Sequence, residues 1–192
     1  MPKNKLILVS QSPRRVELLK RICDFEQKNL NFVEAEWRPA WSPKSYVASI
    51  VAEKLKKARA KFPKRKILVA DTIVVLDERV MNKPKSHKEA CQMLKSLSGR
   101  RHKVYTRFAL ESERKKGGFN CIQKTIESEV SFHRLSSPEI NKYIKNFKPF
   151  DKAAAYGFQD GANHFVKKLK GSYSNVLGLA VLEVEIALGR LK

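Results

Sequence analysis

The sequence predicts an α/β protein with a mixed, twisted sheet and flanking helices. Short apolar runs typical of strands alternate with amphipathic helical segments along the chain. Two β-rich runs, 102–110 and 121–132, follow one another with only a polar loop between them, which indicates an inserted hairpin. The length of 192 residues fits a single domain over 1–192, either undivided or split into two lobes around a central cleft.

The first elements are marked by an apolar run and a helix start signal. The unbroken run at 6–9 is typical of a strand covered on both faces. Ser12 followed by Pro13 predicts a helix that begins with a hydroxyl cap, and its apolar face follows at helical spacing. A second strand is expected at 30–35.

The middle of the chain contains a second helix and a long strand. Ser42 and Pro43 repeat the helix start signal, and apolar residues follow at helical spacing. The apolar run 67–76 predicts a strand that is interrupted by one acid, Asp71. A turn and a short return strand are expected over 77–81.

Two capping boxes predict further helices in the rest of the chain. They lie at 86–89 and 136–139, and the first of these helices ends at 98–99. A strand is expected at 164–169 and a last helix at 181–191.

The net charge of +21 indicates an anionic partner. Nucleic acid, an acidic membrane surface and a polyanionic small substrate all fit a chain with 40 Lys and Arg against 19 Asp and Glu. The excess is spread along the chain, and the densest run, 54–66, has the spacing of a solvated helix face. The hydrophobic fraction of 42% excludes a disordered basic tail.

Several features predict a cytoplasmic protein without a membrane partner. No apolar run approaches the roughly 18 residues of a membrane span. The run at 6–9 is too short for the core of a signal peptide. The three cysteines are far apart in the sequence, which argues against a disulfide framework and fits a reducing compartment.

The first candidate site is the segment 10–15, where a strand meets a helix N-terminus. Backbone N–H groups and the positive end of the helix dipole favour an anion there. Arg14 and Arg15 in the first turn oppose the dipole, and an anion bound beside them would offset that cost. The alternative is a simple hydroxyl cap followed by exposed charges.

The second candidate is Asp71, a carboxylate inside an apolar strand. Such an acid is rarely left unpaired. A metal ligand or general base and a buried salt bridge to a lysine are equally compatible with its position.

Weaker signals lie further along the chain. Lys83 is held extended before Pro84 and suits a phosphate. The small-residue stretch 151–159 allows a close approach of a ligand, and Gln159 can contact a base edge. A glycine-bounded polar loop spans 171–178, and the four histidines have no ligand spacing.

Six short segments follow one another along the chain: SerGlnSerProArgArg (10–15), AlaAspThr (70–72), LysPro (83–84), LeuSerGlyArgArgHis (97–102), AspLysAla with TyrGly and Gln (151–159), and GlySerTyrSerAsnValLeuGlyLeu (171–179). In this order they resemble the Maf family of nucleoside triphosphate pyrophosphatases, also called septum formation inhibitors. The resemblance runs from Leu6 to about Leu191.

The resemblance implies a Maf/ITPase-like fold and hydrolysis of a nucleoside triphosphate to the monophosphate and pyrophosphate with Mg²⁺ or Mn²⁺. The 151–159 pattern is similar to the subfamily that acts on dTTP and UTP. Asp71 matches the position of the proton acceptor or metal-bound base. The resemblance further suggests triphosphate ligands at Ser10, Arg14, Arg15 and Lys83, specificity positions at Arg14, Thr72 and Gln159, and a homodimer.

Three departures from the family pattern concern the site. Glu36 and Glu34 both compete for a second acid that helps to hold the metal, and Glu36 is favoured. An ungapped match puts Leu55 at a lysine position, so that Lys54 or Lys56 fills it, with Lys54 taken as the ligand. Asp160 stands where the family usually has a glycine.

An alternative function follows from the charge and these departures. The chain would be a low-activity Maf-like protein that binds nucleic acid or associates with the septum. That hypothesis predicts duplex binding with a steep dependence on salt.

Overall fold

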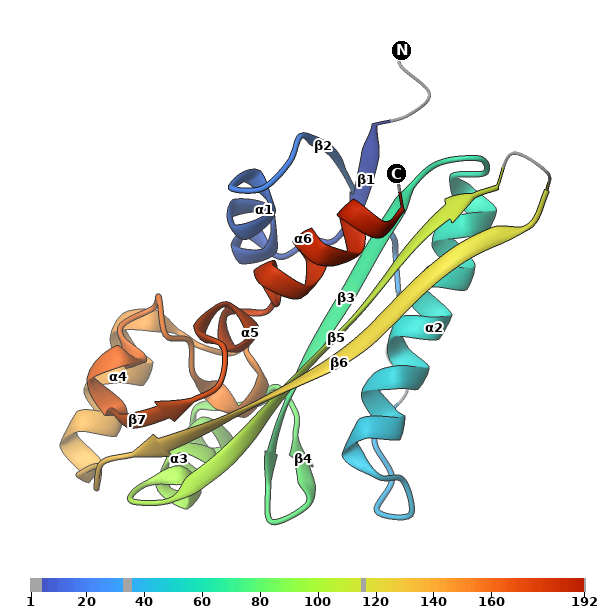
Figure 1. Cartoon of the computed structure of the whole chain (residues 1–192). Coiled ribbons are helices and arrows are strands. Elements are labelled where there is room, and N and C mark those ends of the chain that lie inside the picture. The colour runs from blue at the N-terminus through green and yellow to red at the C-terminus, as the bar shows by residue number, and fades with distance from the viewer. Residues whose placement is uncertain (1–4, 33–35, 115–116, 192) are drawn as a thin grey trace.

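The computed structural model describes residues 5–32, 36–114 and 117–191 and has one seven-stranded sheet with helices on both faces (Figure 1). The strands are β1 (Leu6–Val9), β2 (Phe25–Lys28), β3 (Ile67–Leu76), β4 (Arg79–Met81), β5 (Arg101–Glu113), β6 (Phe119–Phe132) and β7 (Val166–Lys170). The helices are α1 (Pro13–Lys20), α2 (Pro43–Lys61), α3 (His87–Leu97), α4 (Ser137–Phe147), α5 (Tyr173–Leu177) and α6 (Val181–Arg190), with 3₁₀ turns η1 (Ala153–Ala155) and η2 (Ala162–Phe165).

The sheet is mixed, which confirms the predicted fold class. Its strand order is β2-β1-β3-β5-β6-β7, and β4 pairs with β3. β1 runs parallel to β2 and β3, whereas the pairs β3–β5, β5–β6 and β6–β7 are antiparallel. The expected long hairpin is the pair β5–β6.

One edge of β3 is open in the middle, and this gap positions the site. β5 pairs with β3 over 67–75 along one edge. Along the other edge, β1 pairs with 67–69 and β4 with 74–76. Within the described part of the chain, residues 70–73 therefore have no strand partner on that side. Asp71 lies in this gap, just past the C-terminal end of β1.

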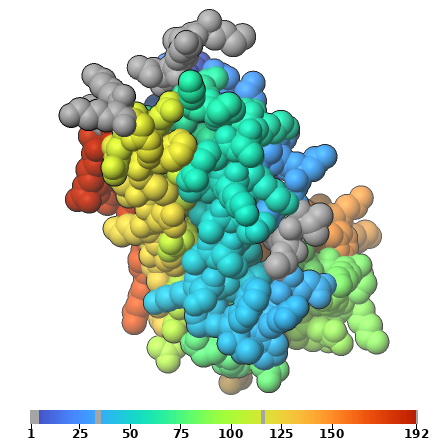
Figure 2. All heavy atoms as spheres, turned by 90° about the vertical axis from the view of Figure 1, so that its right-hand side faces the viewer, coloured from blue at the N-terminus to red at the C-terminus, as the bar shows by residue number. Residues whose placement is uncertain are grey.

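The two faces of the sheet carry different helices. α2 packs alone on one face, where its Val51 and Leu55 bury against Ile67 and Val69 of β3. Figure 2 shows α2 lying along the molecular surface on this side. The other face carries α1, α3, α4, α5 and α6 over the larger core (Figure 1). Because side chains alternate along a strand, Asp71 points toward α2 while Thr72 points toward α1 and α5.

Most helix starts follow their sequence signals. Ser12, Ser42 and Ser136 each accept a hydrogen bond from a backbone N–H in the first turn of their helix. The capping box at 136–139 is complete. At 86–89 only half of the box forms, because the Glu89 carboxylate accepts from the N–H of Lys85 instead.

The strand expected at 30–35 is wrong where the structure describes it. Residues 30–32 form no strand, and 33–35 lie outside the described residues. The strand is β2, which pairs with β1 at the sheet edge and is half exposed, so its four residues show little apolar signal. Leu30 and Phe32 instead pack beside α2.

Two other boundaries differ from expectation. The predicted strand at 164–169 begins only at Val166, since 162–165 form η2. The polar loop predicted at 171–178 contains the short helix α5, which is capped by Ser172. No helix in the described ranges is long and apolar enough to cross a membrane.

Candidate active site

A cavity of about 790 Å³ opens along the unpaired edge of β3. The junction of β1 and α1, the inner side of α2, the segment after β4 and residues 151–158 contribute to its wall. Its charged lining is six basic and four acidic residues: Arg14, Arg15, Lys54, Lys83, Lys85, Lys152, Glu36, Asp71, Glu89 and Asp151. The lining is net positive, as an anionic ligand requires.

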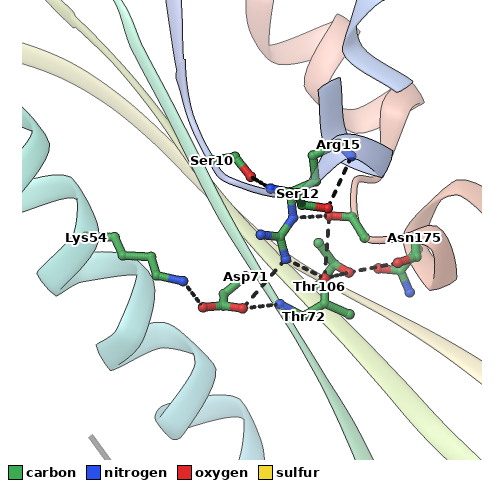
Figure 3. A network of polar contacts seen from close by, with 9 residues as sticks. Ser10, Ser12, Arg15, Lys54, Asp71, Thr72, Thr106 and Asn175 are labelled. Atoms are coloured by element: carbon green, nitrogen blue, oxygen red, sulfur yellow. Dashed lines mark hydrogen bonds and ion pairs between the residues drawn. The ribbon is translucent and has the colours of Figure 1, made fainter. Parts of the chain in front are cut away.

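Asp71 is the centre of the polar network in this cavity (Figure 3). Asp71 is only 7% exposed. One carboxylate oxygen pairs with Lys54 Nζ, while the other accepts from the N–H of Thr72 at 2.7 Å and lies 3.6 Å from Arg15 Nη2. Burial alone would raise the pKa of Asp71, but Lys54, Arg15 and the Thr72 N–H outweigh it and hold that pKa below its ordinary value. Asp71 is therefore a carboxylate at neutral pH.

Arg15 is built into the wall rather than extended into the cavity. Its Nε donates to the carbonyl oxygen of Gly178 at 2.8 Å, and its Nη2 donates to Thr72 Oγ1 at 3.1 Å. The guanidinium thus joins α1 to β3 and to the end of α5, with Asp71 beside it (Figure 3). It supplies positive charge to the cavity and orients Asp71.

A buried hydroxyl and amide network supports Thr72 from behind. Thr72 Oγ1 lies 2.8 Å from Thr106 Oγ1, and Thr106 donates to the carbonyl oxygen of Asn175 at 2.8 Å. The Asn175 side chain donates to Val104 O and to Ser128 Oγ. Thr106 was not predicted as a site residue, and Asn175 was predicted only as part of the polar loop 171–178. Both are polar residues with no exposed surface, which only the structure shows.

The start of α1 offers hydrogen-bond donors to the cavity. Ser10 lies at the end of β1, and its Oγ accepts from the N–H of Ser12 at 3.1 Å. Ser12 Oγ accepts from the N–H of Arg15 at 3.4 Å. The tight β1–α1 turn therefore directs the N-terminus of α1 and its dipole at the open edge of β3.

A second group of charges lies beside the part of the wall to which 151–158 contribute. Arg14 Nη1 is 3.2 Å from the Asp160 carboxylate. Lys152, which is 8% exposed, lies 2.8 Å from Asp151 and 3.4 Å from Asp160. The sequence singled out Asp160 only as a departure from the family pattern, and it placed Lys152 within a candidate segment without giving it a role.

The remaining predicted residues differ in their exposure and in whether they line the cavity. Glu36 and Lys83 are exposed and line the cavity. Gln159 is exposed and is not among the described residues that line it. Lys54 faces Asp71 from α2, while Lys56 is exposed on the same helix. Glu34 lies outside the described residues.

Oxygen ligands in the cavity suit a hard divalent cation. Asp71 and Glu36 both line it, although the described residues contain no cluster of three or more His, Cys, Asp or Glu side chains arranged to hold a metal. Mg²⁺ is usually held by one or two carboxylates and completes its shell with phosphate oxygens and water. The lining therefore contains carboxylates of the type that holds Mg²⁺, while both oxygens of Asp71 already contact Lys54, Arg15 or the Thr72 N–H.

Histidine does not contribute to the described lining of the cavity. His102 lies behind it, with Nε2 at 2.8 Å from the hydroxyl of Tyr156. Burial lowers the pKa of His102 to about 3, so this imidazole is neutral at physiological pH.

Comparison with known proteins places the whole chain in one family. The sequence model of the family described as Maf-like protein matches residues 5–191. The chain is 38% identical to the dTTP/UTP pyrophosphatase of Geobacter sp. strain M21, covering 98% of this chain and 96% of that protein. It is 40% identical to the dTTP/UTP pyrophosphatase of Syntrophus aciditrophicus, covering 94% of this chain and 86% of that protein.

A solved structure, the Staphylococcus aureus Ham1 protein, is similar with a TM-score of 0.49 at 13% identity, over 98% of this chain and all of that one. The family model covers residues 5–191, and the two relatives at 38% and 40% identity match 94% or more of this chain. This chain belongs to the Maf family.

Proposed function

We propose that this protein hydrolyses dTTP and UTP to the monophosphate and pyrophosphate. The observation that carries the proposal is Asp71, a buried carboxylate kept ionised by Lys54 and Arg15 at the open edge of β3. The cavity around it has a net positive lining and a volume that suits a small ligand. Relatives named dTTP/UTP pyrophosphatase match the chain over nearly its full length.

In the proposed reaction, a water oxygen attacks the α-phosphorus and the bond to the α–β bridging oxygen breaks. Asp71 orients that water and accepts its proton. Ser10, Arg14, Arg15, Lys54 and Lys83 bind the triphosphate, and their donors stabilise the negative charge that develops on the leaving pyrophosphate. A Mg²⁺ or Mn²⁺ ion held by Glu36 and Asp71 would screen phosphate charge and lower the pKa of the attacking water.

Base selection is proposed to depend on Arg14, Thr72 and Gln159. The support comes from the family resemblance and, for two of them, from place: Arg14 and Thr72 both line the cavity. Gln159 is exposed and follows Phe158, which lines the cavity, so a role in base selection would need its side chain to turn toward the nucleotide.

The test is a panel of nucleoside triphosphates with Mg²⁺ or Mn²⁺, followed by pyrophosphate release. We expect dTTP and UTP to be the best substrates. Asp71→Asn keeps the size of the side chain and removes its charge, so kcat should fall by about a hundredfold or more, the scale of a lost general base.

Two results would contradict the proposal. One is equal pyrophosphate release by Asp71→Asn and the wild type on every substrate. The other is a preference for purine nucleotides. A far-ultraviolet circular dichroism spectrum checks that Asp71→Asn is folded, because the substitution leaves Lys54 and Arg15 without a counter-charge.

We further propose that residues 1–192 act as a single Maf-like domain in the cytoplasm and form a homodimer. These three statements rest on the resemblance and on the composition, and light scattering of the purified chain tests the last of them. The alternative of nucleic-acid binding stays a prediction, which a duplex titration at low salt tests.

A further inference from the structure

The carboxylate of Asp160 forms an ion pair with Arg14, a cation of the proposed phosphate site. Its carboxylate lies 3.2 Å from Arg14 Nη1, and Arg14 lines the cavity. The same carboxylate oxygen is 3.4 Å from Lys152 Nζ, a second cation of the lining. Asp160 itself is not among the lining residues. It therefore contacts two cations of the lining from beside the cavity.

The local backbone is shaped to hold the carboxylate there. The N–H of Asp160 donates to the carbonyl oxygen of Gly157 at 3.0 Å, which closes a tight turn. A Cβ atom on Gly157 would lie 2.4 Å from the Asp160 carboxylate and 2.9 Å from Lys152 Cε. The N–H of Gly157 in turn donates to the hydroxyl of Tyr143 in α4 at 3.1 Å. The missing side chain at Gly157 thus makes the space that Asp160 and Lys152 share.

Lys152 does not need Asp160 as its counter-charge. A buried ammonium requires a nearby anion, and Asp151 supplies one at 2.8 Å. Arg14 differs, because its side chain is 26% exposed and water can solvate it. Loss of the Asp160 charge would therefore leave no buried cation unpaired. Because both side chains of the Arg14–Asp160 pair are partly exposed, neither charge needs the other to offset a loss of hydration. The pair can therefore serve function rather than stability.

We infer that Asp160 is an internal competitor of the nucleotide phosphates: its carboxylate holds Arg14 in the resting cavity, and a phosphate oxygen must displace it. The inference rests on the proposed function for the identity of the nucleotide. Because the carboxylate also repels a polyphosphate approaching Arg14 and Lys152, it weakens binding of the substrate. It takes no part in the bond-breaking step and should leave kcat unchanged.

The test compares Asp160→Asn with the wild type in steady-state hydrolysis of dTTP. The substitution keeps the shape and removes the charge. We expect KM to fall by about two- to fivefold, the scale of one partly exposed ion pair, with kcat unchanged. The matched control is Asp77→Asn, which removes an equal charge from an exposed pair with Arg100, both of whose contacts are 2.7 Å, outside the cavity lining. That variant should keep the wild-type KM.

A binding measurement separates this inference from the proposed function. Inorganic tripolyphosphate needs no hydrolysis, and calorimetry should show it binding more tightly to Asp160→Asn than to the wild type and to Asp77→Asn. If the wild type hydrolyses no nucleotide, the proposed function fails, while this titration still decides the inference. Equal or weaker binding to Asp160→Asn, or no binding to any of the three proteins, overturns it. A raised KM would instead make Asp160 a residue that positions Arg14. The thermal midpoint of each variant confirms that it is folded.

Discussion

Two cations from opposite sides of the sheet keep Asp71 charged. Figure 3 shows Lys54 arriving from α2 and Arg15 from α1, on either side of β3. A carboxylate this deeply buried would otherwise favour its neutral form. The two ion pairs therefore set the protonation state on which a role as base or metal ligand depends. The sequence was compatible with two interpretations of Asp71, a functional group and a buried salt bridge. The observed ion pairs allow both at once.

Lys54→Met should move the acidic limb of the pH–rate profile to higher pH. With Lys54 gone, the pKa of Asp71 rises, so the carboxylate protonates at a higher pH and activity is lost earlier on acidification. At neutral pH, kcat/KM for dTTP should also fall by about tenfold or more, since a charge-assisted hydrogen bond is removed from the site. The measurement is kcat/KM from pH 4.5 to pH 8, at about constant ionic strength.

Lys56→Met is the matched control for that experiment. Lys56 lies on the same helix but is exposed, so its removal changes the net charge equally without reaching Asp71. Its profile should overlay that of the wild type. An unmoved acidic limb in Lys54→Met would show that Asp71 is not the group titrating there.

Site residues could be predicted from the sequence where they are unusual within their own segment. Asp71 breaks an apolar strand, and Arg14 and Arg15 crowd a helix start, so each is unusual within its own segment. Thr106, Asn175 and Lys152 show no such local anomaly. They join the site through contacts between segments far apart in the chain, and only the fold makes those contacts. Asp160 was visible only as a departure from the family pattern.

At the scale of elements, the start of α1 combines structure with the proposed binding. Its N-cap, Ser12, holds the first turn and contacts both Ser10 and Arg15, which line the cavity. Ser42 caps α2 in the same way, and it is exposed and not part of the described cavity lining. The two serines make the same capping hydrogen bond, but only Ser12 lies at the cavity, so Ser42 is a matched control for Ser12.

Ser12→Ala and Ser42→Ala should each lower the free energy of unfolding by about 1 kcal/mol, the usual cost of a lost hydroxyl cap. Only Ser12→Ala should also raise the KM for dTTP, because only the α1 cap orients donors toward the cavity. Urea unfolding and steady-state kinetics on both variants check this. Equal KM values for the two variants would mean that the first turn of α1 plays no part in binding.

Elements with an internal signal were predicted well. Serine before proline located α1 and α2, and the β5–β6 hairpin followed from two long β-rich runs. β2 was misplaced because an edge strand needs no apolar alternation, and its position is set by pairing with β1. α5 has five residues, fewer than two helical turns, so its sequence carries too short a pattern to identify it.

At the scale of the whole molecule, the net charge of +21 greatly exceeds what the cavity uses. The charged lining is six basic residues against four acidic ones, whereas the chain carries 40 basic residues against 19. Most of the positive field therefore comes from side chains outside the cavity. Such a field raises the local concentration of an anionic substrate without contacting it. The sign of the charge agrees with the proposed substrate, and because most of the charge lies outside the cavity, it predicts a role in substrate capture rather than in chemistry.

If the charge serves capture, kcat/KM for dTTP should fall several-fold between about 30 mM and 300 mM salt, because the screening length shortens over that range. kcat at saturating dTTP should change little, since screening outside the cavity does not alter the bound state. The double variant Lys142→Gln/Lys145→Gln removes two exposed charges from α4, outside the described cavity lining, and should lower kcat/KM modestly at low salt only. A kcat/KM that is independent of salt in the wild type would contradict capture and leave the large positive charge without a kinetic role.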